Sequence, residues 1–108
     1  MPAAHQITIS THRVLRKLGA NIRDARLRRR LSMQVVADRA RTTRATLTRV
    51  ERGDPATSMG VYCSVLNVLG LLDGVGMLAD VATDHVGVEL EASRLPRRTP
   101  KAPKSGPT

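Results

Sequence analysis

A chain of 108 residues has the length of a single domain and can bury a modest core without disulfides. Hydrophobic residues make up 41% of it, but Phe and Trp are absent and Tyr62 is the one aromatic residue, so the core must be aliphatic. The single cysteine, Cys63, excludes an intramolecular disulfide. No apolar run approaches the roughly 18 residues that span a membrane, and residues 1–10 lack the order of a signal peptide. We therefore expect a cytoplasmic protein with no membrane partner.

The net charge of +9 is distributed in blocks. Residues 13–53 contain thirteen Lys and Arg and three acidic residues, whereas residues 54–93 contain six acidic residues and no Lys or Arg. Residues 94–108 add five basic residues. Fifteen of the eighteen basic residues are Arg, whose planar fork suits phosphate and guanine, although a GC-rich genome also favours Arg codons. The division predicts a basic surface for a polyanion and an acidic, apolar surface for a protein.

An uncharged segment, residues 1–12, precedes the first helical pattern, and we expect it to be flexible. Apolar residues then recur at steps of three and four and predict a helix that runs to about Arg30. Its buried face consists of Leu15, Leu18, Ile22 and Ala25. Arginines group on another face of this helix, and we expect Arg23, Arg26 and Arg30 to be solvated there.

Three more helices are marked by their ends. Ser32 and Thr43 are expected N-caps of the second and third helices, because a hydroxyl can accept a hydrogen bond from a free backbone N–H. The run at 53–55, Gly-Asp-Pro, ends the third helix. Ser58 opens a fourth helix that ends at Gly70, and a fifth short helix is expected at about 75–81. The inward residues are Val36, Ala37, Ala40, Leu47, Val50, Val61, Val65, Leu66, Val68 and Leu69.

After Asp84 the pattern changes. Val86, Val88 and Leu90 alternate with polar or small residues, which is typical of a strand, and the alternative is a helix that continues to residue 94. We favour the strand, at a dimer interface, because a single strand needs an edge with which to pair. Residues 96–108 contain nothing to bury and predict a disordered basic tail.

The second and third helices are separated by a turn of only a few residues, which is the spacing of a helix-turn-helix, a motif that lays its second helix in the DNA major groove. The run LSMQVVADRA at 31–40, followed by TTRATLTRVERG at 42–53, resembles the phage-repressor-like (Xre/Cro) family. The likeness covers about residues 15–70 and implies an all-α, five-helix lambda-repressor-like domain, which we place at residues 13–83. Two residues depart from the family pattern: Met33 stands where a phosphate-clamping Gln is usual, and Arg41 where Gly is usual.

The resemblance also assigns roles within the motif. The base-contacting residues that it implies are Arg44, Ala45 and Arg49, and an Arg–guanine contact is worth roughly 1–3 kcal/mol of discrimination. The residues expected to contact the DNA backbone are Ser32, Gln34, Thr43, Thr46, Thr48 and Arg52. We expect Glu51 to pair with a basic residue of the first helix, Arg23 or Arg26, and not to touch DNA.

Other chemistry is not indicated. The histidines and Cys63 are too scattered for a metal site, so we expect neither a metal nor a cofactor. The G-x-G-x-x-A match at 74–79 lacks the βαβ unit that a dinucleotide site needs, and we expect no enzyme. A basic RNA-binding or purely protein-binding module is the other class considered, and the lack of aromatic residues argues against single-stranded RNA.

One helix-turn-helix reads a half-site, so we expect a homodimer on a palindromic operator with half-sites about 34 Å apart. We assign dimerisation to the fourth and fifth helices and dimerisation or partner binding to residues 84–95; alternatively, these residues complete the monomer core. The segments 69–73, 86–91 and 94–98 resemble HipB-type antitoxins. That resemblance implies a repressor of its own operon that neutralises a HipA-like Ser/Thr kinase toxin, and the alternative is a stand-alone regulator without a toxin.

Overall fold

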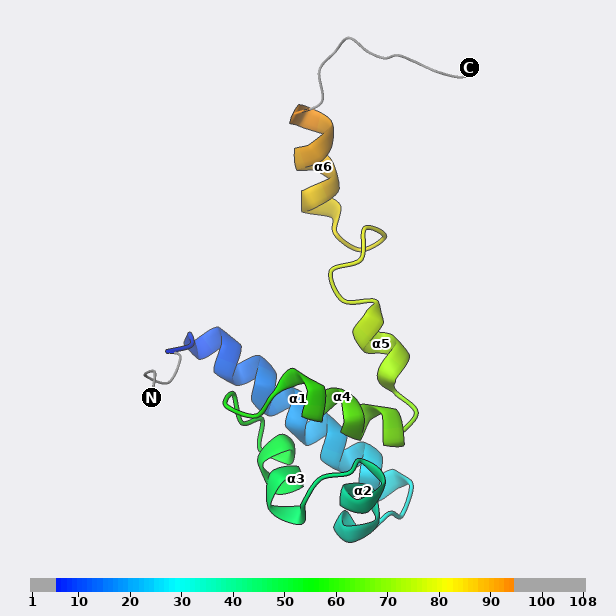
Figure 1. Cartoon of the computed structure of the whole chain (residues 1–108). Coiled ribbons are helices and arrows are strands. Elements are labelled where there is room, and N and C mark those ends of the chain that lie inside the picture. Colours follow the sequence, from blue (N-terminus) through cyan, green and yellow to red (C-terminus); the bar gives the residue numbers. More distant parts are fainter. Residues whose placement is uncertain (1–5, 95–108) are drawn as a thin grey trace. The chain divides into compact units, whose positions relative to one another are not determined.

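The computed structural model describes residues 6–94, and in this range it contains six helices and no strand (Figure 1). The helices are α1 (Ile9–Arg28), α2 (Met33–Arg39), α3 (Arg44–Glu51), α4 (Met59–Val68), α5 (Leu72–Gly76) and α6 (His85–Arg94). The expected all-α class is confirmed for these residues, although the helices number six and not five. The described residues divide into two units, a first unit that ends at Gly76 and a second that begins at Met77. The predicted tail, residues 96–108, lies outside the described residues.

Hydroxyl side chains start the first four helices. The expected caps Ser32, Thr43 and Ser58 are confirmed, since each Oγ accepts a hydrogen bond from the backbone N–H three residues later, at 3.1, 3.1 and 3.2 Å. Thr8 caps α1 in the same way, at 3.1 Å from the backbone nitrogen of Thr11. Residues 9–12, which we expected in a flexible N-terminus, therefore form the first turn of α1.

The same four helices end in one motif. The residue after each C-cap has a left-handed backbone, with φ of 55° at Arg30, 57° at Arg41, 73° at Gly53 and 76° at Gly70. In each case its N–H bonds the carbonyl three residues back, and the next N–H bonds the carbonyl five residues back. This is the Schellman motif, which satisfies the last free carbonyls of a helix. It ends two helices at glycine, as expected, and two at arginine.

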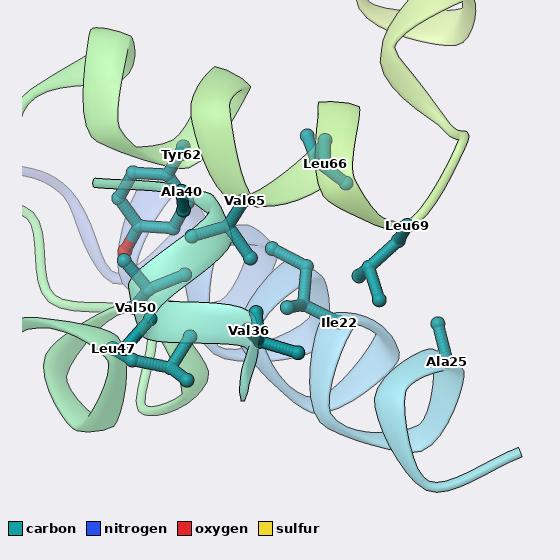
Figure 2. Close-up of a cluster of buried hydrophobic side chains, with 11 residues drawn as sticks. Ile22, Ala25, Val36, Ala40, Leu47, Val50, Tyr62, Val65, Leu66 and Leu69 are labelled. Atoms are coloured by element: carbon teal, nitrogen blue, oxygen red, sulfur yellow. The ribbon is translucent and has the colours of Figure 1, made fainter. Parts of the chain in front are cut away.

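The core lies in the first unit and is aliphatic except for Tyr62 (Figure 2). Helix α1 packs against α3, and α2 packs against both α3 and α4. The buried residues are Ile22, Ala25, Val36, Ala37, Ala40, Leu47, Val50, Tyr62, Val65, Leu66 and Leu69. All of these except Tyr62 were expected to point inward, so helical periodicity located the core. Four other expected core residues are only partly buried, namely Leu15, Leu18, Val61 and Val68.

Two glycines bring α1 and the end of α3 into backbone contact. A Cβ on Gly19 would lie 2.6 Å from the backbone nitrogen of Gly53 and 2.6 Å from the carbonyl oxygen of Val50. A Cβ on Gly53 would lie 2.3 Å from the carbonyl oxygen of Leu15. Neither position has room for a side chain, so this pair sets how closely α3 approaches α1.

Two expected elements between residues 70 and 94 differ in the structure. The fifth helix occupies Leu72–Gly76 instead of 75–81, because Ala79 adopts a left-handed backbone, φ 61°, and Asp80 forms a turn with the N–H of Ala82 at 2.8 Å.

The favoured strand over 86–90 is wrong, because α6 covers this segment as a helix. A strand needs a neighbouring edge, which a single chain does not supply here, whereas a helix satisfies its backbone groups locally. The Asp84 carboxylate also accepts a hydrogen bond from the Gly87 N–H at 3.1 Å and so starts the helix.

Candidate nucleic-acid interface

The turn between α2 and α3 is fixed at both ends. Arg41 continues the chain out of α2 in the left-handed conformation, and the N–H of Thr42 bonds the carbonyl of Ala37 at 2.9 Å. Thr43 then caps α3. A non-glycine residue in this conformation costs roughly 1–2 kcal/mol. The hydrogen bonds on both sides of Arg41, from the Thr42 N–H and at the Thr43 cap, offset this cost. The departure from the family pattern at Arg41 therefore leaves the turn geometry intact.

Helix α3 separates its buried and exposed residues cleanly. Leu47 and Val50 have no exposed surface, as predicted, and they anchor α3 on the core (Figure 2). Arg44, Ala45 and Arg49 are exposed. The three residues expected to contact bases therefore lie together on the solvent side of one helix.

Threonine hydroxyls order the surface of α3. The Oγ1 of Thr46 accepts hydrogen bonds from the Oγ1 of Thr43 at 3.1 Å and from Nη1 of Arg49 at 3.2 Å. The Oγ1 of Thr48 donates to the carbonyl of Arg44 at 3.0 Å. These three threonines were expected to contact the DNA backbone. In the structure each hydroxyl forms a hydrogen bond within α3 or at its N-cap. Thr46 in particular holds the guanidinium of Arg49.

The expected backbone contacts on α2 are exposed at its first turn. Ser32 caps the helix through its Oγ. Gln34 donates from Nε2 to Oδ1 of Asp38 at 2.8 Å, one turn along the same helix. Arg52, the C-cap of α3, is exposed as well. Ser32 and Gln34 therefore lie at the start of α2 and Arg52 at the end of α3, whereas Thr46 and Thr48 lie within α3.

A buried ion pair joins α1 to α3. Nε of Arg26 donates to Oε2 of Glu51 at 2.7 Å and Nη2 donates to Oε1 at 3.1 Å, while Nη1 donates to the carbonyl of Leu31 at 3.1 Å. The two side chains are 8% and 7% exposed. The hydrogen bonds to Glu51 raise the pKa of Arg26 above its ordinary value. The expected pairing of Glu51 is confirmed with Arg26, whereas the expectation that Arg26 is solvated is wrong, because Glu51 draws it inward.

The loop after α3 is closed by Asp54, a contribution that our sequence reasoning missed. Its carboxylate accepts hydrogen bonds from Oγ1 of Thr57 at 2.8 Å and from the N–H of Ala56 at 3.1 Å, and these bonds, followed by the charge of Arg49, lower its pKa. Its carbonyl accepts a hydrogen bond from the hydroxyl of Tyr62 at 2.8 Å, and burial raises the pKa of that hydroxyl. The Asp-Pro-x-Thr pattern was the signal available for this turn.

Residues 17–77 match the family model of the helix-turn-helix domain. Because this match covers more than half of the chain, the protein belongs to that family. Helix-turn-helix domains indicate sequence-specific DNA binding and transcription regulation. No curated protein and no solved structure matches the chain significantly.

Within residues 6–94, no helix is long and apolar enough to cross a membrane. The same part of the chain contains no cluster of three or more His, Cys, Asp or Glu side chains arranged to hold a metal ion.

Proposed function

We propose that this protein is a transcriptional repressor that reads DNA with α3. The observation that carries the proposal is the division of that helix: Leu47 and Val50 are completely buried, while Arg44 and Arg49 are exposed. A helix anchored in this way presents its guanidinium groups to the major groove, where Arg pairs with O6 and N7 of guanine.

Specific roles follow for the exposed residues of the motif. Arg44 and Arg49 read bases, and Ala45 offers apolar contact, for example to a thymine methyl group. Backbone positioning falls to Ser32, Gln34, Thr43, Thr46, Thr48 and Arg52. The bond from Arg49 to Thr46 supports a base-reading role, because it reduces the freedom that the long side chain loses on binding.

A substitution series separates base reading from backbone contact. Operator fragments are selected from genomic DNA, and binding is measured by fluorescence anisotropy with competitor DNA present. We expect Arg44→Ala and Arg49→Ala each to weaken operator binding by roughly 1–3 kcal/mol and competitor binding far less. Arg52→Ala should weaken both alike. Equal losses on all sequences for every variant would contradict the base-reading roles.

We further propose that the repressor acts as a homodimer on a palindromic operator. A domain with one reading helix covers one half-site, and two-fold pairing places two such helices about 34 Å apart. Exposed apolar side chains at the start of α4 and just before α5, Met59 at 58% and Leu71 at 41%, support an interface there. Sedimentation equilibrium and a spacing series of half-sites test this. A monomer that binds isolated half-sites as tightly as palindromes would contradict it.

The finer proposal is an antitoxin role against a HipA-like Ser/Thr kinase toxin. Its support is the resemblance of segments 69–73 and 86–91 to HipB-type antitoxins, together with the exposed apolar side chains Leu78, Val86 and Leu90 in an acidic surrounding. Segment 94–98, the third part of that resemblance, extends beyond the described residues.

A kinase-like gene directly downstream, whose product copurifies with this chain, is the result expected of an antitoxin. If no such gene is present, the stand-alone regulator is the remaining form of the proposal. A DNA-binding measurement does not distinguish the antitoxin from the stand-alone regulator, because both would bind DNA with α3.

A further inference from the structure

A hollow of about 270 Å³ opens where α1, α2 and α3 meet. The residues that line it are Arg23, Arg26, Met33, Thr48, Glu51 and Arg52. All three helices of this site belong to the first unit of the chain. At about 30 Å³ per water molecule, the hollow holds roughly nine waters, which is room for a phosphate group and part of its hydration shell.

The charges in the hollow do not cancel. Arg26 and Glu51 neutralise each other through two hydrogen bonds, so their pair contributes little net charge. Arg23 and Arg52 remain, and among residues 6–94 neither has a side-chain hydrogen bond or an ion pair. The hollow therefore carries two exposed guanidinium groups and no free carboxylate.

The other lining residues limit which groups can hold a ligand. The side chain of Met33 has no hydrogen-bond donor, and the hydroxyl of Thr48 already donates to the carbonyl of Arg44. Arg26 has already committed three of its five N–H groups, so Arg23 and Arg52 supply most of the free donors in the hollow. Two guanidinium groups around one hollow select an anion with several acceptor oxygens, and a phosphate oxygen pair matches the guanidinium fork.

We propose that this hollow is the seat of one DNA backbone phosphate, with Arg23 as its principal donor and Arg52 as the second. This inference rests on the proposed function, since Thr48 lies within the proposed reading helix and Arg52 is its C-cap. It assigns a ligand to Arg23, which our sequence reasoning left on a solvated face. It also explains how the domain holds the phosphate backbone although Met33 offers no donor.

The test uses the full chain and a fluorescently labelled random-sequence DNA duplex, with anisotropy measured over a series of NaCl concentrations. Arg23→Ala is compared with Arg28→Ala, which removes the same charge from an exposed position of α1 outside the hollow. We expect Arg23→Ala to reduce the slope of log affinity against log salt by about 0.9, the value for one phosphate contact. Its affinity should fall roughly tenfold, as for one charge-assisted hydrogen bond. Arg28→Ala should have a clearly smaller effect.

A second variant separates charge from geometry. Arg23→Lys should keep the slope and lose part of the affinity, because an ammonium lacks the paired donors of a guanidinium. Thermal unfolding by circular dichroism should be unchanged in all three variants, since both arginines are exposed. If Arg23→Ala and Arg28→Ala reduce the slope equally, or if neither does, the phosphate seat is refuted while DNA binding stands. If the wild-type chain does not bind the duplex, the proposed function itself fails.

Discussion

Removing either member of the buried ion pair between α1 and α3 should destabilise the fold strongly. The Arg26 guanidinium makes two hydrogen bonds to Glu51 and one to the carbonyl of Leu31. Breaking a buried pair on one side costs about 3–5 kcal/mol, because the other charge stays buried without a partner. The pair lines an open hollow that admits water, so the lower end of this range applies. We expect a loss of about 3 kcal/mol for Arg26→Met and for Glu51→Leu.

The double variant is the decisive measurement. Apolar residues of similar volume leave no unpaired charge, so the loss in the double variant should not exceed that of either single variant. The coupling energy is then about 3 kcal/mol, at the top of the range for residues in contact. Urea unfolding followed by circular dichroism gives the three free energies. Each single variant should also melt roughly 12–24 °C lower, at 4–8 °C per kcal/mol for a domain of this size. A double variant that loses the full sum of the single losses would refute the reasoning.

Three further predictions concern the backbone and the loop after α3. Gly19→Ala should cost at least about 3 kcal/mol, because its Cβ would meet backbone atoms at 2.6 Å. Gly74→Ala is the control, with nothing within 4 Å of its Cβ, and should stabilise by about 0.5–1 kcal/mol; equal melting temperatures for the two variants would contradict the close approach. Arg41→Gly should relieve the left-handed backbone and stabilise by about 1 kcal/mol, or 4–8 °C in melting temperature, whereas Arg41→Ala should not. The pKa of the Asp54 carboxyl is lowered from 3.8 in the folded state. Its contribution to the free energy of unfolding is therefore complete above pH 3.8 and is lost as the pH falls through the lower pKa of the folded state. The stability difference between wild type and Asp54→Asn should therefore shrink below pH 3.8, and a constant difference would exclude this role for Asp54.

Periodicity and capping were sufficient to predict α2, α3, α4 and most of α1, because both are local. The steps of three and four between apolar residues placed Ile22, Leu47 and Val50 in the core, and the hydroxyls of Ser32 and Thr43 marked where helices begin. These signals depend on residues within one or two turns of each other. For the same reason they located the motif and the exposed arginines of α3.

Contacts between distant residues were predicted less completely. The pairing of Glu51 with α1 followed from charge, but the choice between Arg23 and Arg26 depends on how the two helices cross. The contact between Gly19 and Gly53 depends on the distance between two backbones, which no sequence period encodes. The helix at residues 85–94 was only the alternative prediction, because alternation alone cannot say whether a neighbouring edge is present.

The ten-residue helix α6 buries none of its side chains. A helix shorter than about 12–15 residues is marginal in water, so its amide protons should exchange with solvent nearly as fast as those of an unfolded peptide. The amides of Ile22 and Val50, by contrast, should exchange only when the first unit unfolds as a whole. A protease with broad specificity should accordingly cut near α6 long before it reaches the arginine-rich helices, and the fragment that survives should keep its melting transition.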